Sequence, residues 1–208
     1  LIVLLTALSA GLPRPLAAVQ ILWINLVSDG VVTVNLIMEP LEGDEMQRPP
    51  TRTGERLLSR KIFRRLALLT PAMAISTLGY FVFRLQSGAP FAQVQTETFT
   101  MLAVCQWFNV LNCRSEEHSA LTWSLFRNPW LVGGLTLGMV LQALVIFAPP
   151  LNALFHTVPI PWENAFLIGV VASLVLWVEE IRKALLRRRK RRSAGVEARP
   201  YPGDAVNV

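Results

Sequence analysis

The 208-residue sequence has few charged residues and little cysteine or histidine. Charged residues make up 16% of the chain and hydrophobic residues 52%, whereas a soluble domain has about 25% charged residues. This composition excludes an ordinary soluble domain and indicates a membrane protein. Cys105 and Cys113 lie about two turns apart on one predicted helix, which excludes a disulfide scaffold. His118 and His156 stand alone in predicted loops, so they do not indicate a histidine metal site.

Apolar runs of about the length that crosses a bilayer recur along the chain. The predicted fold is therefore all-α: a polytopic transmembrane helical bundle with the end of one helix followed by five full spans. The spans are predicted near residues 1–10, 17–38, 62–83, 98–113, 129–149 and 160–180. They form a C-terminal membrane domain over residues 1–185, followed at 186–208 by a basic and then disordered cytoplasmic tail. The first run has no charged segment or cleavage site of a signal peptide, so we expect a fragment that begins inside a membrane helix.

The basic residues predict the orientation. If the five full spans each cross the membrane, the loops 39–65 and 114–127 and the tail from 179 onward lie on the same side. This side holds 18 of the 20 Lys and Arg residues. The positive-inside tendency makes that side the cytoplasm. We expect an integral protein of the plasma (inner) membrane with a cytoplasmic C-terminus. The net charge of +6 thus reflects topology and contact with the lipid bilayer, and it does not predict nucleic-acid binding.

A polar cluster interrupts the second apolar run, in the sequence INLVSDG. An aspartate near the middle of a membrane helix costs roughly 3 kcal/mol, so it is expected to have a partner. Asn25, Ser28 and Asp29 are spaced i, i+3 and i+4 and share one helical face. Their oxygens are hard ligands for Ca²⁺ or a similar cation. Local unwinding beside Gly30 would add main-chain carbonyls. We interpret the trio as a metal site, the alternative being hydrogen bonds to a neighbouring helix.

A second polar group occupies the run near 98–113. Gln106, Asn109 and Asn112 are three residues apart, and their amide oxygens are neutral ligands. We take Gln106 as a further candidate metal ligand, with interhelical hydrogen bonding as an equally open alternative. For Asn109 and Asn112 hydrogen bonding is the preferred interpretation. The single amides Gln20 and Gln142 are expected to be packing or interface groups.

The last span ends in the sequence WVEEIRK. Glu179 precedes Lys183 by four residues, which is the favourable order for an ion pair on one helix. Because these residues lie at the predicted cytoplasmic end, we expect a solvated or interfacial pair without a catalytic role.

Four stretches in a fixed order carry a family resemblance. They are LLTALSAGLPRPLAAVQILWINLVSDG, MQRPP in the following loop, WFNVLNCRSEE, and the closing LWVEEIRK. Together they resemble the carboxy-terminal transmembrane region of P-type cation-transporting ATPases, specifically the calcium-pump branch. The resemblance implies that the chain holds the end of the family's fifth membrane helix and all of its sixth to tenth, as a fragment of a larger transport domain.

The resemblance also implies roles for residues. The family's motif Asn-Leu-Val-Thr-Asp-Gly supplies cation ligands from a partly unwound helix, and the matching positions are Asn25, Ser28 and Asp29. Gln106 stands where two-site calcium pumps carry a glutamate, as in the single-calcium branch. The transported cation is expected to be Ca²⁺. The phosphorylation motif Asp-Lys-Thr-Gly-Thr is not in this sequence, so ATP and Mg²⁺ would bind only to the cytoplasmic domains of the full-length pump.

The chain itself is therefore expected to hold no catalytic residue. Its expected partners are the remaining N-terminal part of the same pump, which would carry the phosphorylation, nucleotide and actuator domains and the earlier helices. The alternative is a non-catalytic multi-spanning membrane subunit with a binding or regulatory function. A passive channel is disfavoured because the sequence has no repeated selectivity segment.

Overall fold

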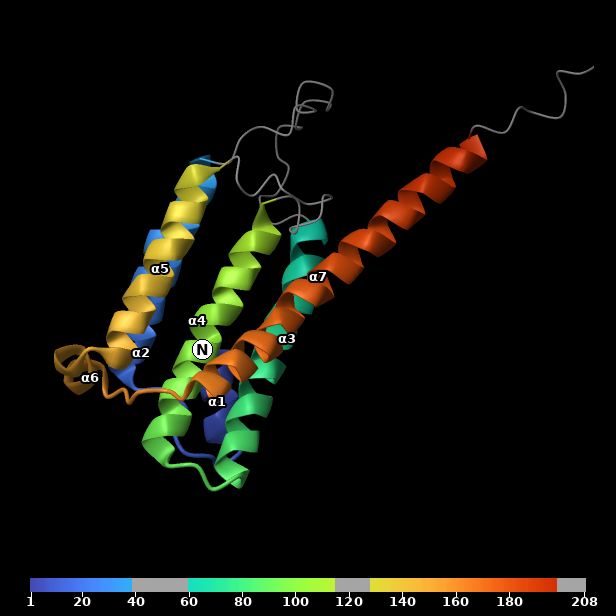
Figure 1. Cartoon of the computed structure of the whole chain (residues 1–208). Coiled ribbons are helices and arrows are strands. Elements are labelled where there is room, and N and C mark those ends of the chain that lie inside the picture. The colour runs from blue at the N-terminus through green and yellow to red at the C-terminus, as the bar shows by residue number, and fades with distance from the viewer. Residues whose placement is uncertain (39–59, 115–127, 198–208) are drawn as a thin grey trace, which may run out of the picture.

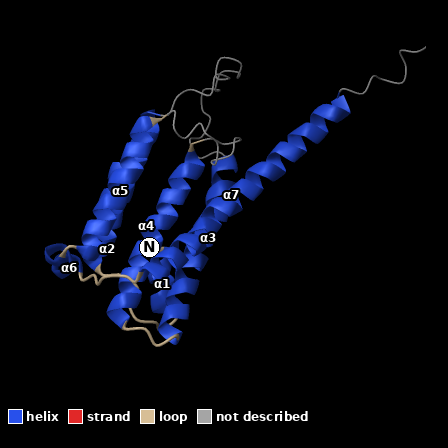
Figure 2. Ribbon diagram, viewed as in Figure 1, coloured by secondary structure: helices blue, strands red, loops and turns tan. Residues whose placement is uncertain are grey.

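The structure, a computed structural model, describes residues 1–38, 60–114 and 128–197 (Figure 1). These residues form helices and turns and contain no strand (Figure 2). The elements in chain order are α1 (Ile2–Ser9), α2 (Ala18–Trp23), the π-helix η1 (Ile24–Val32), the 3₁₀-helix η2 (Thr33–Met38), α3 (Arg60–Gln86), α4 (Phe91–Cys113), α5 (Pro129–Phe147), α6 (Pro149–Phe155) and α7 (Trp162–Glu197). The prediction of an all-α membrane fragment is confirmed.

The helices pack in two groups that meet at α4. One group contains α3, α4 and α7, and the other places α2, η1 and η2 along α5, with the short α6 at one end (Figure 1). The first group shares a core that includes Met101, Cys105 and Ala172. The second is joined to α4 through Phe99, which packs with Ile24 and neighbouring apolar residues. Thus α4 is the central element of the bundle.

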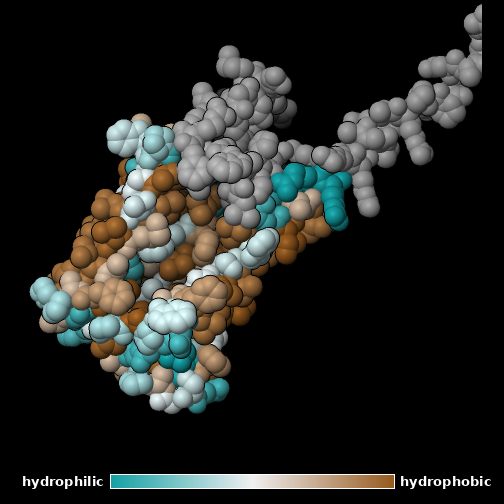
Figure 3. All heavy atoms as spheres, viewed as in Figure 1, coloured by the Kyte–Doolittle hydropathy of each residue, from teal (hydrophilic) through white to brown (hydrophobic). Residues whose placement is uncertain are grey.

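Large apolar side chains cover the outside of the helices, and Figure 3 shows hydrophilic residues gathered near the ends. Among the described residues, four segments have the length and composition of membrane spans: Ala18–Asn35, Ile62–Gln86, Pro129–Phe147 and Trp162–Arg188. This pattern is that of an integral membrane protein. The helix α4 is not one of the four because its amides and Glu97 lower its mean hydropathy. A central helix can carry such groups since other helices shield it from lipid.

The helices extend the predicted spans at several ends. The spans predicted near 62–83 and 98–113 lie inside the longer α3 and α4, and the connection after α5 contains the helix α6. The last helix does not stop near 180 but continues to Glu197, because its run of Leu, Arg and Lys consists of good helix formers. The first part of the predicted tail is thus helical, and residues 198–208 lie outside the described part of the chain.

Candidate functional site

The helix that carries the polar cluster is irregular where the cluster lies. The regular helix α2 gives way to the π-helix Ile24–Val32, which is followed by 3₁₀ turns. A π-helix bonds each N–H to the carbonyl five residues earlier, is rare, and often marks a functional site. It contains Asn25, Ser28, Asp29 and Gly30. The departure from regular helix expected beside Gly30 therefore takes the form of widened turns followed by tightened ones.

The side chains of the cluster are described only in part. Asn25 is exposed on the surface of this chain, and so is Gly30. A Cβ added to Gly30 would meet nothing within 4 Å, so no described residue packs against η1 at this position. The backbone of Ser28 and Asp29 lies in the same π-helix, whereas their side chains fall outside what the structure describes.

The amides of α4 have buried oxygens without donors. Oε1 of Gln106, Oδ1 of Asn109 and Oδ1 of Asn112 are all inaccessible to solvent, and no described residue donates a hydrogen bond to them. Asn112 does use its other end, since Nδ2 donates to the carbonyl of Val175 in α7 over 3.2 Å. This is the interhelical role predicted for Asn112. For Gln106 the structure offers no such bond to its oxygen.

The side-chain oxygens of two other buried amides, Gln142 and Gln20, do accept hydrogen bonds. Oε1 of Gln142 accepts from Nε1 of Trp23 over 3.1 Å, and Nε2 of Gln142 donates to the hydroxyl of Thr100 over 3.4 Å. Gln20 accepts from the N–H of Ala17 and donates to a backbone carbonyl. Both are packing groups, as predicted. The contrast separates Gln106 from the amides that only join helices.

The segments that carry the candidate ligands pack against each other. Val32 at the end of η1 forms a small core with Val110 of α4 and Leu131 of α5, and Trp107 packs on this core. Since Trp107 directly follows Gln106, the contact places the Gln106 turn of α4 beside η1. In the described part of the chain no three His, Cys, Asp or Glu side chains gather as a metal cluster.

Comparison with known proteins assigns the family. The sequence model described as "Cation transporting ATPase, C-terminus" matches residues 13–185. The chain belongs to this family. The ATPase region is 35% identical over 182 residues to Calcium-transporting ATPase 1 of Schizosaccharomyces pombe, with 86% of this chain and 20% of the relative covered. It is 34% identical over 174 residues to the Calcium-transporting ATPase of Bacillus subtilis, with 83% and 19% covered.

A mammalian relative agrees with these two. Calcium-transporting ATPase type 2C member 2 of Mus musculus is 32% identical over 174 residues, covering 83% of the chain and 18% of the relative. The chain thus spans about a fifth of the length of the curated relatives it matches. The resemblance to the carboxy-terminal region of P-type cation-transporting ATPases, in the calcium-pump branch, is confirmed.

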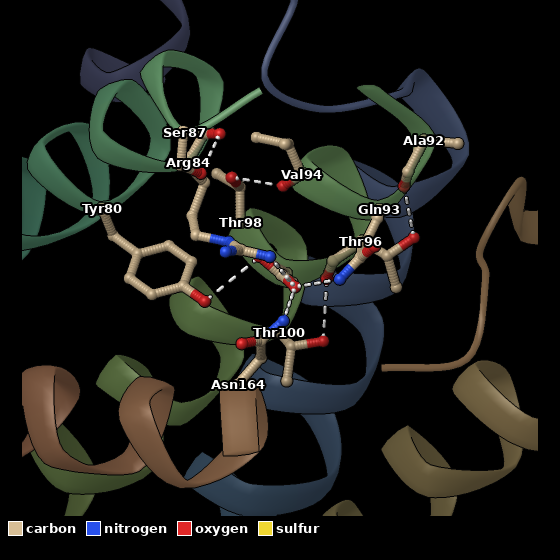
Figure 4. A network of polar contacts seen from close by, with 11 residues as sticks. Tyr80, Arg84, Ser87, Ala92, Gln93, Val94, Thr96, Thr98, Thr100 and Asn164 are labelled. Carbon is tan, nitrogen blue, oxygen red and sulfur yellow. Dashed lines mark hydrogen bonds and ion pairs between the residues drawn. The ribbon is translucent and has the colours of Figure 1, made fainter. Parts of the chain in front are cut away.

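The ATPase region also contains a buried carboxylate that the sequence did not bring to attention. Glu97 lies near the start of α4 with a fully buried side chain, and Arg84 of α3 pairs with it over 2.7 Å. Tyr80, Gln93 and Asn164 donate to the same carboxylate over 2.7–3.1 Å, and Figure 4 shows these side chains converging. The sequence does contain a signal for this pair: Arg84 directly follows one apolar run and Glu97 directly precedes the next, so a short loop brings them together.

The ion pair predicted at the end of α7 is wrong in its partners and its exposure. Glu179 is fully buried and pairs with Arg65 of α3 over 3.0 Å and with Arg182 over 2.5 Å. Lys183 is also buried and donates to the carbonyl of Asn112 over 3.1 Å. The i, i+4 spacing does not select these partners: Glu179 pairs with Arg182 at i+3 and with Arg65 of α3, and Lys183 bonds to α4. These contacts join α3, α4 and α7 near the end of α4, whereas Glu97 lies near its start.

Proposed function

We propose that the chain is the C-terminal part of the ion-translocating membrane domain of an ATP-driven pump, and that the transported cation is Ca²⁺. Asn25, Ser28 and Asp29 of η1 and Gln106 of α4 are its ligands within this chain. The observation that carries the proposal is the coincidence of the π-helix with the sequence NLVSDG.

The irregular backbone supports a binding site. Backbone groups outside a regular helix are tolerated inside a membrane only where protein buries them or where they line a cavity. Transporters use such broken helices to direct carbonyl oxygens toward an ion. In η1 the irregular turns hold an amide, a hydroxyl and a carboxylate within five residues. This is the set of oxygen ligands that a hard cation such as Ca²⁺ accepts.

The buried oxygen of Gln106, which has no donor among the described residues, supports a second point of coordination. A buried acceptor that has no donor costs about 1–3 kcal/mol, and a cation would remove this cost. Gln106 is neutral, so Asp29 supplies the formal charge among the four proposed ligands. This composition fits a single divalent ion held by this part of the pump rather than two.

The remaining parts of the proposal concern the intact pump. ATP and Mg²⁺ act on the cytoplasmic phosphorylation, nucleotide and actuator domains, and the earlier membrane helices complete the ion site on the exposed side of η1. The loop at residues 39–59, which lies outside the described residues, connects η2 to α3 and relays the motion of the phosphorylation domain. The protein lies in the plasma membrane with its C-terminus in the cytoplasm, because this side collects the basic residues.

Phosphorylation of the full-length protein by ATP tests the proposal. We expect phosphoenzyme to form with Ca²⁺ and to form poorly with Mn²⁺, Mg²⁺, Na⁺ or K⁺ as the only added transport ion. Replacing Gln106 with Ala should raise the half-saturating Ca²⁺ concentration about fivefold, the equivalent of one lost neutral contact of about 1 kcal/mol.

The control is Gln142→Ala, because Gln142 is a buried amide on the neighbouring helix whose oxygen already has a donor. Its half-saturating Ca²⁺ concentration should equal that of the unmodified pump. The proposal is wrong if no ion supports phosphorylation, or if the Gln106 and Gln142 variants change Ca²⁺ dependence equally.

A further inference from the structure

The second half of the irregular segment is attached to α5 through one asparagine. Nδ2 of Asn35 donates to the carbonyl of Val31, four residues earlier, over 2.5 Å. The carbonyl of Asn35 accepts from Nδ2 of Asn128 over 3.4 Å, and Oδ1 of Asn128 accepts from the N–H of Leu131 at the start of α5. A chain of side-chain and backbone bonds thus runs from α5 to Val31, two residues after Asp29.

The contact surface on α5 is made by two buried glycines. A Cβ on Gly134 would overlap Nδ2 of Asn35 and lie 3.1 Å from the carbonyl oxygen of Val31. A Cβ on Gly138 would lie 3.0 Å from Cγ2 of Val32 and 3.6 Å from Nε1 of Trp107. The absence of side chains here is what allows η1 and η2 to approach α5 so closely. By contrast, a Cβ on the adjacent Gly133 would meet nothing within 4 Å.

These contacts act where the hydrogen-bond spacing changes. The π-helix ends at Val32 and the 3₁₀-helix begins at Thr33, so the carbonyl of Val31 lies at a junction between two ladders of different spacing. Groups at such junctions need partners other than the regular ladder, and the amide of Asn35 supplies one. The bond stabilises the wide turns upstream, which hold the proposed ligands.

We propose that Asn35 is a positioning residue for the cation site. Gly134 leaves the space that the Asn35 side chain occupies beside the carbonyl of Val31. This inference rests on the proposed function, because it assigns a consequence for Ca²⁺ affinity to contacts made by η1 and η2. Asn35 itself does not bind the ion. It fixes the end of the π-helix that carries Asn25, Ser28 and Asp29.

Ca²⁺-dependent phosphorylation of the full-length pump tests the inference. Gly134→Ala inserts a methyl group against Asn35 and the Val31 carbonyl, and should raise the half-saturating Ca²⁺ concentration about tenfold. Gly133→Ala makes the same change one residue away in open space, so its value should stay within about twofold of the unmodified pump. Because the two variants share the same gain in helix propensity, their difference reports the contact with Asn35.

Two further variants separate positioning from loss of folding. Asn35→Ala removes the bond to Val31 without adding bulk, and should raise the half-saturating Ca²⁺ concentration about fivefold while the maximal phosphoenzyme level is kept. In the double variant Asn35→Ala/Gly134→Ala the overlap with the Asn35 amide is absent and only the approach of 3.1 Å to the carbonyl oxygen of Val31 remains. Its affinity should therefore lie close to that of Asn35→Ala. Equal affinities of Gly133→Ala and Gly134→Ala, additive losses in the double variant, or an unchanged affinity of Asn35→Ala would each overturn the inference.

Asp29→Asn, measured in parallel, distinguishes a failure of the positioning role of Asn35 from a failure of the proposed cation site. If it lowers Ca²⁺ affinity while the Asn35 and Gly134 variants do not, the positioning role fails and the proposed function stands. If Asp29→Asn leaves affinity unchanged, the proposed function itself fails.

Discussion

Replacing Glu97 with Gln should strongly destabilise the bundle. The carboxylate accepts five hydrogen bonds from Tyr80, Arg84, Gln93 and Asn164, two of them from the Arg84 guanidinium. Glutamine keeps the shape but turns an NH₂ group toward these donors and leaves Arg84 without its counter-charge. Breaking a buried pair by removing one partner costs about 3–5 kcal/mol. The side chain of Arg84 retains 16% exposure, so we expect the lower end, about 3 kcal/mol.

Unfolding of the purified chain by sodium dodecyl sulfate in detergent micelles, followed by circular dichroism, measures this loss. The matched control is Glu163→Gln, because Glu163 is exposed in the first turn of α7, and it should change the free energy of unfolding by less than about 1 kcal/mol. The double variant Arg84→Gln/Glu97→Gln restores a neutral pair and should be more stable than Glu97→Gln alone. A loss for Glu97→Gln no larger than for Glu163→Gln would refute the reasoning.

Three further results are expected. A reporter fused at Val208 should be located in the cytoplasm, since the basic segments lie on that side; a reporter exposed outside the cell would reverse the orientation. The purified 208-residue chain should not hydrolyse ATP, because it lacks the phosphorylation motif; measurable turnover would contradict this. Gln142→Ala should lower the free energy of unfolding by about 1–3 kcal/mol because it leaves Nε1 of the half-buried Trp23 without its acceptor; an unchanged value would show that this bond does not contribute.

The helical membrane fold could be predicted because it depends on local properties of the sequence. Apolar runs of sufficient length reveal membrane helices without knowledge of their neighbours. The irregularity at NLVSDG could also be anticipated, since polar groups and Gly30 stand in an otherwise apolar run. The succession of π-turns and 3₁₀ turns could not, because the local sequence carries no information on the contacts of Asn35 and Val32 with the glycines of α5.

The pairing of polar groups was less predictable. Gln106 and Gln142 look alike in the sequence, and only packing shows that the oxygen of Gln142 has a donor whereas that of Gln106 has none among the described residues. Packing also decides the partner of Glu179, because Arg65 lies more than a hundred residues earlier in the chain. Spacing rules identify neighbours on one helix, and they carry no information on which other helix lies alongside.

Calcium binding by the full-length pump and by its Asp29→Asn variant tests the central claim most directly. Equilibrium binding of radioactive Ca²⁺ should show an affinity at least about a hundredfold lower for the variant, since replacing a carboxylate ligand removes about 3 kcal/mol of charge-assisted interaction. Glu163→Gln, the same change at an exposed carboxylate, should bind like the unmodified pump. If Asp29→Asn binds Ca²⁺ with unchanged affinity, Asp29 is an interhelical hydrogen-bonding group and the cation site lies elsewhere.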